Sequence, residues 1–258
     1  MFGGGPGLTH DAKEFLYRLE AEPEIILLGV FCQAESQSWR SILKDLWKRR
    51  GLLMFPLLIA RIVSSFIRFL KSPRQETALN NKMTQLLDRI HHVRDIHAPA
   101  VLEQVRLLEP DLGLIYGSPI LKPELFEIPR LGTLGIHHGK VPAYRGNKTT
   151  FWAMYNGETV AGVTIQKVNA GLDMGSIVKE DVVPIGRRSY RDVWRALKTR
   201  GLNLYVQAIL EVKNGTAAYK PQMGKREKLY RNPKCKDFIV FWSRRIKRRF
   251  GKRSIQNV

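Results

Sequence analysis

Cysteine is scarce in this chain: Cys32 and Cys235 are the only two among 258 residues. They stand far apart and outside any CxxC or metal-ligand spacing, so the sequence gives no sign of a disulfide framework or a zinc site. We expect no bound metal. A reducing compartment suits this composition, and we expect a cytoplasmic protein.

Long uninterrupted apolar runs are also lacking. The opening residues, MFGGGPGLTHDAKEF, carry neither the basic head nor the apolar stretch of a signal peptide. The most apolar long stretch, Leu52–Leu70, is interrupted by Pro56, Arg61 and Arg68. An arginine near the centre of a bilayer costs at least about 2.5 kcal/mol. We therefore expect neither export nor a transmembrane span.

Acidic residues are few relative to basic ones. The sequence has 23 Asp and Glu against 43 Lys and Arg, which gives a net charge of +20. Such a charge attracts phosphates, nucleic acids and anionic lipid head groups, but it does not choose among them. A peripheral position at the inner membrane surface therefore stays open beside the cytoplasmic one.

The order of the predicted elements indicates an α/β fold. The apolar run Ile25–Phe31 has the length and β-branched content of a buried parallel strand, and Asp11–Ala21 before it is patterned as a helix. Further strands are predicted at Leu112–Tyr116, Thr133–His137, Val160–Val168 and Ile177–Ile185, and helices at Asn80–Asp88, Pro99–Leu108 and Arg191–Val212. Strands alternating with helices predict a mostly parallel sheet flanked by helices.

Composition divides the chain near Lys225. Residues 1–224 are predicted to form one domain, with a long basic and apolar helical insertion at about 38–71. Within it, Trp47–Leu70 is interpreted as a helix that packs on the sheet, with an interfacial membrane helix as the alternative. Residues 225–258 form a basic tail, interpreted as a solvated end or as a contact for anionic membrane or nucleic acid. The oligomeric state is not indicated.

Three of the predicted strands are followed by loops that contain candidate site residues. Gly117, Ser118 and Pro119 follow one strand, His137 ends the next, and the loop NAGLDMG places Asp173 between two glycines. Ligands of α/β sheets bind outside the carboxyl ends of the strands. A histidine near a carboxylate forms an acid and base pair that works near neutral pH without a metal. A structural histidine and a turn-capping aspartate are the alternatives.

The stretch from Pro110 to Val183 resembles the folate-dependent formyltransferases. The motifs PDLGLIYG, ILKPEL, LGTLGIHHGKVPAYRG, WAMYNGE, GVTI and GLDMGS stand in the order of that family. The resemblance extends less closely from the N-terminus to Gln222. The family includes methionyl-tRNA, glycinamide-ribonucleotide and amino-sugar N-formyltransferases, and the resemblance implies a Rossmann-like formyltransferase fold.

The resemblance also implies the site residues. His137 and Asp173 match the family's catalytic histidine and aspartate, and Gly135 stands at the position of its catalytic asparagine. The implied reaction transfers a formyl group from 10-formyltetrahydrofolate to an amine acceptor, with an amino sugar favoured. Two loops are expected to offer backbone groups to the pterin ring: Tyr116, Gly117, Ser118, Pro119 and Ile120 in the first, and Ala170, Gly171 and Leu172, up to Asp173, in the second.

Gly135 and the start of the chain depart from the family pattern. Losing one oxyanion donor costs on the order of a hundredfold to a thousandfold in rate, so Gly135 threatens turnover. His138 is a candidate replacement donor, but only if the strand has ended, because successive side chains on a strand alternate in direction. Met1 and Phe2 run straight into GGGPG, so the first strand of the fold is expected to be missing. We favour a true start of the protein upstream of Met1 over the alternative that the remaining strands close the gap left by the first strand.

Several interpretations of motif and function stay open. GGGPG is interpreted as a plain turn in preference to a phosphate-binding loop. YRG is interpreted either as a turn or as part of the site wall. A catalytically impaired folate-binding protein and a membrane or nucleic-acid binder built on the same fold are the alternatives to an enzyme. Methionyl-tRNA formylation is less favoured, because those enzymes carry a sizeable C-terminal β-barrel and only a short tail follows Gln222 here.

Overall fold

The computed structural model describes residues 1–4, 8–33, 84–223 and 229–250. The insertion expected at about 38–71 lies outside the described residues, as do the first residues of the helix expected at Asn80–Asp88. The strands are β1 (Phe2–Gly4), β2 (Val30–Gln33), β3 (Ile90–Val93), β4 (Gly113–Tyr116), β5 (Thr133–His137), β6 (Val160–Lys167) and β7 (Ile177–Pro184). The helices are α1 (His10–Glu20), the 3₁₀ helix η2 (Thr84–Arg89), α5 (Pro99–Leu107), α6 (Pro123–Phe126), α7 (Thr149–Asn156), α8 (Tyr190–Lys213) and α9 (Cys235–Phe250).

The described strands form one seven-stranded sheet in the order β3-β2-β1-β4-β5-β6-β7. The strands from β3 to β5 pair in parallel, whereas β6 runs antiparallel to both β5 and β7. This is the mostly parallel sheet flanked by helices that the sequence predicts. The parallel half positions the ends of β4 and β5 side by side.

The first strand is present, so the expectation that it is missing is wrong. β1 consists of only three residues and lies in the middle of the sheet, where Phe2 pairs with Phe31 of β2 and with Ile115 of β4. Pairing extends one residue further, because the amide of Phe31 donates to the carbonyl of Met1 over 2.8 Å. A strand this short has no hydrophobic pattern of its own. Hydrogen bonds to two longer neighbours stabilise it instead.

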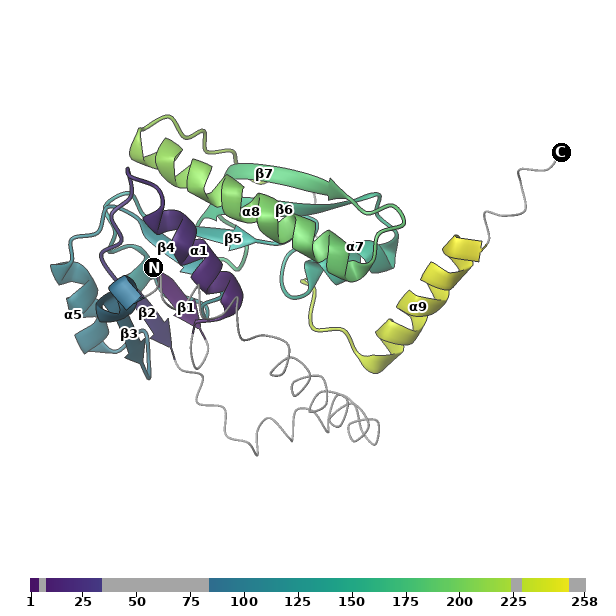
Figure 1. Ribbon diagram of the computed structural model, residues 1–258, viewed down its shortest axis with the longest axis horizontal. Helices are drawn as coiled ribbons and strands as arrows, with labels where there is room; N and C mark the ends of the chain where they lie inside the picture. Colours follow the sequence, from purple (N-terminus) through teal and green to yellow (C-terminus); the bar gives the residue numbers. More distant parts are fainter. Residues whose placement is uncertain (5–7, 34–83, 224–228, 251–258) are drawn as a thin grey trace.

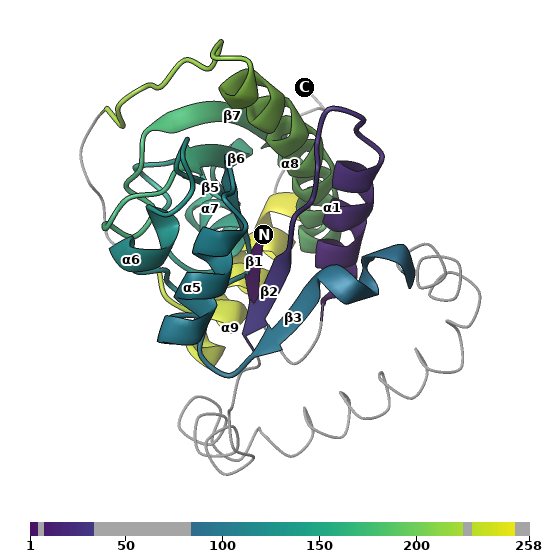
Figure 2. The ribbon, with the colours of Figure 1, turned by 90° about the vertical axis from the view of Figure 1, so that its left-hand side faces the viewer.

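Helices cover both faces of the sheet, which gives three layers (Figures 1 and 2). Helices α1 and α8 cover one face, where Phe15 of α1 stacks on Tyr205 of α8 with ring centroids 4.7 Å apart. Helices α5 and α6 cover the other face and bury Val105 and Leu125 against Phe31 of β2. Each such side chain contributes on the order of 1.5–3 kcal/mol when fully buried. The sheet is therefore held on both faces by apolar packing against helices.

Tyr205 connects α8 to the strands that carry the site. Its buried hydroxyl donates to the carbonyl of Leu134 in β5 over 2.7 Å and accepts from the amide of Ile115 in β4 over 3.0 Å. Burial raises the pKa of Tyr205, so the hydroxyl keeps the proton that it donates. These two hydrogen bonds fix the spacing of β4 and β5, the two strands whose ends carry the candidate site.

The C-terminal segment is ordered where the structure describes it. Helix α9 packs on α7 through Phe241, which is 3% exposed and lies 4.9 Å from the ring of Phe151. Basic composition suggested a solvated end, but two phenylalanines at helical spacing, Phe238 and Phe241, bind this segment to the core. The domain boundary at 224/225 stays a prediction.

Candidate functional site

Alternation along β5 aims its side chains at two different sides of the sheet. His137 lines a cavity together with the backbone of Gly135, while Ile136 and His138 approach Gly201 of α8 on the other side. A period of two is the ordinary geometry of a strand. β5 therefore presents both Gly135 and His137 to the cavity. These are two of the positions that the formyltransferase resemblance implies for the site.

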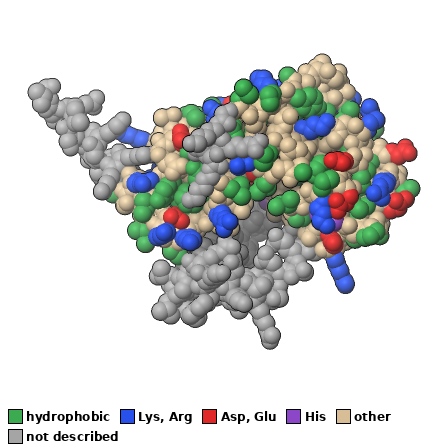
Figure 3. Space-filling model, turned by 180° about the vertical axis from the view of Figure 1, so that it is seen from behind, with side chains coloured by type: hydrophobic (Ala, Val, Ile, Leu, Met, Phe, Trp, Pro, Cys, Tyr) green, Lys and Arg blue, Asp and Glu red, His purple; other side chains and the backbone are tan. Residues whose placement is uncertain are grey.

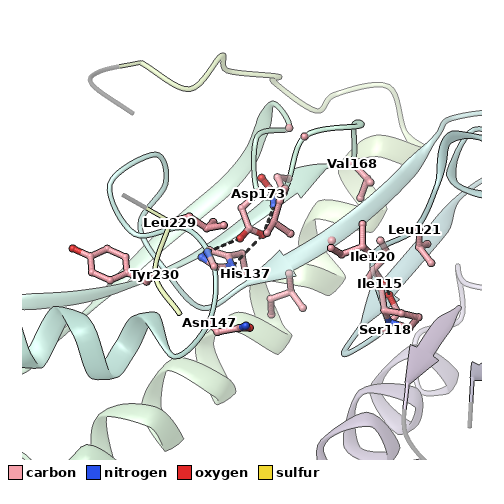
Figure 4. A pocket seen from close by; sticks show the side chains of 18 of the residues that line it. Ile115, Ser118, Ile120, Leu121, His137, Asn147, Val168, Asp173, Leu229 and Tyr230 are labelled. Carbon is pink, nitrogen blue, oxygen red and sulfur yellow. Dashed lines mark hydrogen bonds and ion pairs between the residues drawn. The ribbon is translucent and has the colours of Figure 1, made fainter. Parts of the chain in front are cut away.

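The cavity has a volume of about 930 Å³ and lies at the ends of β4 and β5 (Figure 4). Pockets of 300–1,000 Å³ are typical of small-molecule sites. Its lining includes Gly117, Ser118, Pro119 and Ile120 after β4, the loop from Asn169 to Asp173 after β6, and residues 229–234 of the C-terminal segment. The rim is apolar and open, since Ile120 is 70% exposed and Leu172 is 42% exposed.

The loop that carries Asp173 reaches the cavity by folding back along the sheet. Because β6 is antiparallel to β5, its last residue Lys167 lies beside Leu134, away from the end of β5 at His137. The loop then returns along this face, and Asp173 sits in the left-handed region with φ 51°. A left-handed aspartate is uncommon and costs energy, and such residues gather at functional sites. The sequence predicted the meeting of His137 and Asp173 but not this route.

His137 lies between two hydrogen-bond acceptors. Its Nε2 is 2.7 Å from the carbonyl oxygen of Tyr144, and its Nδ1 is 3.3 Å from Oδ1 of Asp173. A carbonyl can only accept, so Nε2 carries a hydrogen. Nδ1 is therefore the ring nitrogen that faces the carboxylate, and a proton can pass between Nδ1 and Oδ1 across this contact.

Asp173 is held by three groups from different parts of the chain. The amide of Gly146 donates to its Oδ2 over 2.8 Å, and Nε2 of Gln166 is 3.4 Å from its Oδ1. Gln222 donates to the Asp173 carbonyl and to the Gly175 carbonyl, each over 2.9 Å. Together these contacts fix the position of the Asp173 carboxylate beside His137.

Sequence reasoning missed Gln166 and Gln222 as parts of the site. Gln166 is 7% exposed and stands near the end of the apolar strand VAGVTIQK, where a buried amide is a usable signal that a polar partner lies nearby. Gln222 offers no such signal, because its partners lie more than 40 residues away in sequence.

Gly146, the glycine of YRG, is required by its surroundings. Its φ is 96°, and a Cβ at this position would lie 2.3 Å from the carbonyl oxygen of Tyr230. Tyr230 in turn stacks on Tyr144 with ring centroids 5.2 Å apart and 8° between the planes. The amide of Asn147 donates to the same Tyr230 carbonyl over 2.9 Å. The YRG loop and the C-terminal segment thus build one wall of the cavity together.

His138 does not reach the cavity, although β5 ends one residue earlier. Its ring lies 4.6 Å from the ring of Trp194 on the α8 side. Burial, followed by the neighbouring His137, lowers the pKa of His138 to about 4. His138 therefore cannot replace the amide donor that Gly135 lacks, because the strand alternation continues through it.

The low pKa of His138 predicts a loss of stability in acid. The unfolded chain takes up this proton near pH 6.5 and the folded chain only near pH 4. The contribution is therefore complete above pH 6.5 and is lost as the pH falls towards 4, by at most about 3 kcal/mol at 1.36 kcal/mol per unit. In urea unfolding between pH 7 and pH 4.5, His138→Phe should show a shallower pH dependence than the wild type. Parallel slopes would contradict the assignment.

One group of potential metal ligands occurs among the described residues, outside the cavity. His10, Asp11 and Glu14 of α1 have ligand atoms within 4.8 Å of one another. The ammonium group of Lys198 contacts both carboxylates, at 2.9 Å and 3.1 Å. Lys198 thus lies between the two carboxylates, and Arg18 also pairs with Glu14 over 2.9 Å, so we assign no metal there.

The sequence model of the formyl transferase family matches residues 71–209, which is more than half of the chain. The chain belongs to the formyl transferase family. Over 149 residues it is 33% identical to the methionyl-tRNA formyltransferase of Synechococcus sp. strain JA-2-3B'a(2-13), covering 57% of this chain and 46% of that protein. It is 40% identical over 92 residues to the Geobacter metallireducens enzyme of the same name, covering 35% of this chain and 30% of that protein. The chain therefore spans about half the length, or less, of these relatives.

Solved formyltransferase structures share the fold. The phosphoribosylglycinamide formyltransferase of Anaplasma phagocytophilum matches with a TM-score of 0.58 at 14% identity, over 88% of this chain and 96% of that one. An N-formyltransferase from Helicobacter canadensis, solved with folinic acid and dTDP-3-aminofucose, matches with a TM-score of 0.52 at 17% identity, over 89% of this chain and 69% of that one. The Rossmann-like architecture of the family is thus present here.

Of the residues that the resemblance implies for the pterin, seven line the cavity and one does not. The side chain of Tyr116 points away from the cavity and stacks on Phe15 with ring centroids 5.3 Å apart. The seven that line it are Gly117, Ser118, Pro119, Ile120, Ala170, Gly171 and Leu172. Gly135, His137 and Asp173 lie in the same lining. Their roles remain predictions.

Proposed function

We propose that this chain is an N-formyltransferase that uses 10-formyltetrahydrofolate and passes the formyl group to an amine. The observation that carries the proposal is the His137–Asp173 pair, 3.3 Å apart, in the lining of a cavity of about 930 Å³. The pair places an acid and base group side by side, and the cavity supplies room for a ligand of folate size. Membership of the formyl transferase family supports the reaction class.

The lining of the cavity fits a flat heteroaromatic ring with polar edges. Ile115, Leu121 and Val168 offer apolar contacts, and the loops from Gly117 to Ile120 and from Ala170 to Asp173 offer backbone groups (Figure 4). Convergent backbone donors and acceptors among apolar side chains are what fix the orientation of such a ligand. The folate would supply the formyl carbon as the electrophile.

The protein's part in the reaction is proton handling at two atoms. As the acceptor amine adds to the formyl carbon, the Asp173 carboxylate takes the proton that the amine loses, directly or through water. The His137 ring, whose Nδ1 faces that carboxylate, stabilises the negative charge that develops on the formyl oxygen by placing a positive charge near it when the ring is protonated. The Tyr144 carbonyl holds Nε2 and keeps the ring oriented throughout.

An amino sugar attached to a nucleotide is the acceptor that we favour. Arg231 and Lys234 lie on the cavity wall contributed by the C-terminal segment, and guanidinium and ammonium groups bind phosphates. The structural relative from Helicobacter canadensis was solved with a dTDP-amino sugar, which supports this class. The sequence relatives are methionyl-tRNA formyltransferases, so initiator tRNA is the second acceptor to assay.

A catalytically impaired folate-binding protein is the second candidate function. Gly135 favours it, because a glycine at the family's asparagine position removes a side-chain donor from the cavity. Both candidates require folate binding. A protein whose function lay in its basic surfaces alone would not require it.

Binding of a formyl-folate analogue is therefore the first experiment. A ligand at about a hundred times its Kd stabilises the folded state by about 2.7 kcal/mol, which corresponds to a rise in Tm of roughly 5–10 °C for a domain of this size. We expect that rise with folinic acid. Because the chain has a net charge of +20, p-aminobenzoylglutamate serves as the control, since it keeps the carboxylates but lacks the pterin. Equal shifts from both ligands, or none from either, would contradict a folate site.

A further inference from the structure

Helix α9 carries an apolar stripe on the side that faces away from the protein. Ile239 is 69% exposed, Trp242 is 59% exposed and Ile246 is 55% exposed. Their spacing of three and four residues places them on one face of the helix. Single exposed apolar residues are ordinary, but a helical row of three at these exposures is not.

The inward face of the same helix fixes the direction of the stripe. Phe241 is 3% exposed in the core, and the guanidinium of Arg244 lies 4.6 Å from the ring centroid of Tyr155 and donates to its carbonyl over 2.8 Å. At 100° per residue, a helix anchored at 241 and 244 must turn 239, 242 and 246 outward. The helix stands at one edge of the molecule (Figure 1). No described residue of the chain is therefore placed to cover the stripe.

The charge of α9 selects the occupant. Its sequence, CKDFIVFWSRRIKRRF, contains six Lys and Arg and a single Asp. A second copy of the chain would bring the same basic helix and a net charge of +20, so like charges oppose self-association through this face. Figure 3 shows Lys and Arg side chains interspersed with hydrophobic ones over the surface seen from behind. An anionic surface that also accepts apolar side chains matches both features.

We propose that α9 is an interfacial helix that binds an anionic phospholipid membrane, with Ile239, Trp242 and Ile246 entering the boundary between head groups and acyl chains. Basic helices with an aromatic and aliphatic face bind membranes in this way, and tryptophan favours the interface. None of the described helices combines the length and apolar character needed to cross a bilayer. RNA satisfies the charge but leaves the apolar stripe exposed.

Residues 229–234 connect the membrane face to the cavity wall. Tyr230 and Lys234 line the cavity, and α9 begins at Cys235 immediately afterwards. A helix docked on a membrane would therefore hold the cavity close to the lipid surface. This placement is independent of the proposed reaction, and its test does not use enzyme activity.

Vesicle flotation of the full chain tests the proposal. The probes are phosphatidylcholine vesicles with and without phosphatidylglycerol. We expect the chain to float with the anionic vesicles only, and the triple variant Ile239→Ser, Trp242→Ser, Ile246→Ser to bind at least about tenfold more weakly. The matched control is Ile26→Ser with Leu107→Ser, which removes apolar side chains that are 80% and 75% exposed elsewhere. Every residue that is changed in the triple variant and in the control is exposed, so we expect both variants to fold.

Three results would overturn the proposal. The triple variant could float as well as the wild type, which would remove the stripe from the interaction. The chain could ignore anionic vesicles and bind RNA equally with and without the stripe. Sedimentation could show a dimer that the triple variant dissociates, with no flotation of the wild type, which would make a second copy the occupant.

Discussion

Asp173→Asn is expected to reduce formyl transfer by about a thousandfold, within the hundredfold to ten-thousandfold range of acid–base catalysis. The change keeps the size of the side chain and an acceptor for the Gly146 amide, which donates to Oδ2 over 2.8 Å. It removes the carboxylate that lies 3.3 Å from Nδ1 of His137. His137→Ala should cause a loss of similar size, because the two residues act as one unit.

Tetrahydrofolate formation in the presence of a nucleotide-linked amino sugar measures this loss, and initiator methionyl-tRNA is tested in parallel. His92→Ala, on an exposed position of β3, is the matched control and should keep wild-type turnover. Folinic acid binding should change only a few-fold in both site variants. Unchanged turnover in Asp173→Asn and His137→Ala would contradict the assignment of the pair.

Gly135→Asn is expected to raise turnover by about tenfold to a hundredfold. One oxyanion donor is worth on the order of a hundredfold to a thousandfold in rate. The resemblance puts Gly135, which has no side-chain donor, at the position of the family's catalytic asparagine. The backbone position accepts a side chain, since a Cβ on Gly135 would meet Val168 Cγ2 at 3.4 Å and Ile115 Cβ at 3.9 Å. Both are ordinary van der Waals distances. The backbone conformation there also suits any L-residue.

Gly135→Ala is the matched control, since it adds the same Cβ without a donor. It should leave turnover at the wild-type value. Equal rates in the Asn and Ala variants would show that Gly135 is not where a donor is missing. A wild type that binds folinic acid but turns over only after Gly135→Asn would identify the natural chain as the impaired folate-binding protein.

The parts of the fold that are visible in the sequence are those with long, regular patterns. β5 was predicted with its observed bounds, Thr133–His137, and the helix predicted at Arg191–Val212 is α8, Tyr190–Lys213. The buried run at Ile25–Phe31 indicated a strand, but pairing begins only at Val30, and Ile26 is 80% exposed. Apolar content alone does not say where a neighbouring strand begins to pair.

The parts that the sequence hides depend on distant partners. The short β1 forms because β2 and β4 hydrogen-bond it from both sides, and no local pattern announces this. α9 was obscured by its basic residues, although Phe238 and Phe241 anchor it to Phe151. At the site, the formyltransferase resemblance predicted that His137 and Asp173 belong together. Gln222 and Tyr230 also contribute to the site, but they lie beyond the stretch Pro110–Val183 that carries the resemblance.

Hydrogen exchange in the presence of folinic acid shows where on the chain the ligand of the thermal-shift experiment binds. We expect slower exchange in residues 117–121 and 169–175, the two loops that line the cavity beside His137. Residues 229–234 should be protected further when a nucleotide-linked amino sugar is added. Ligand-induced stabilisation without protection of the two loops, or with protection confined to other parts of the chain, would contradict a folate site in this cavity.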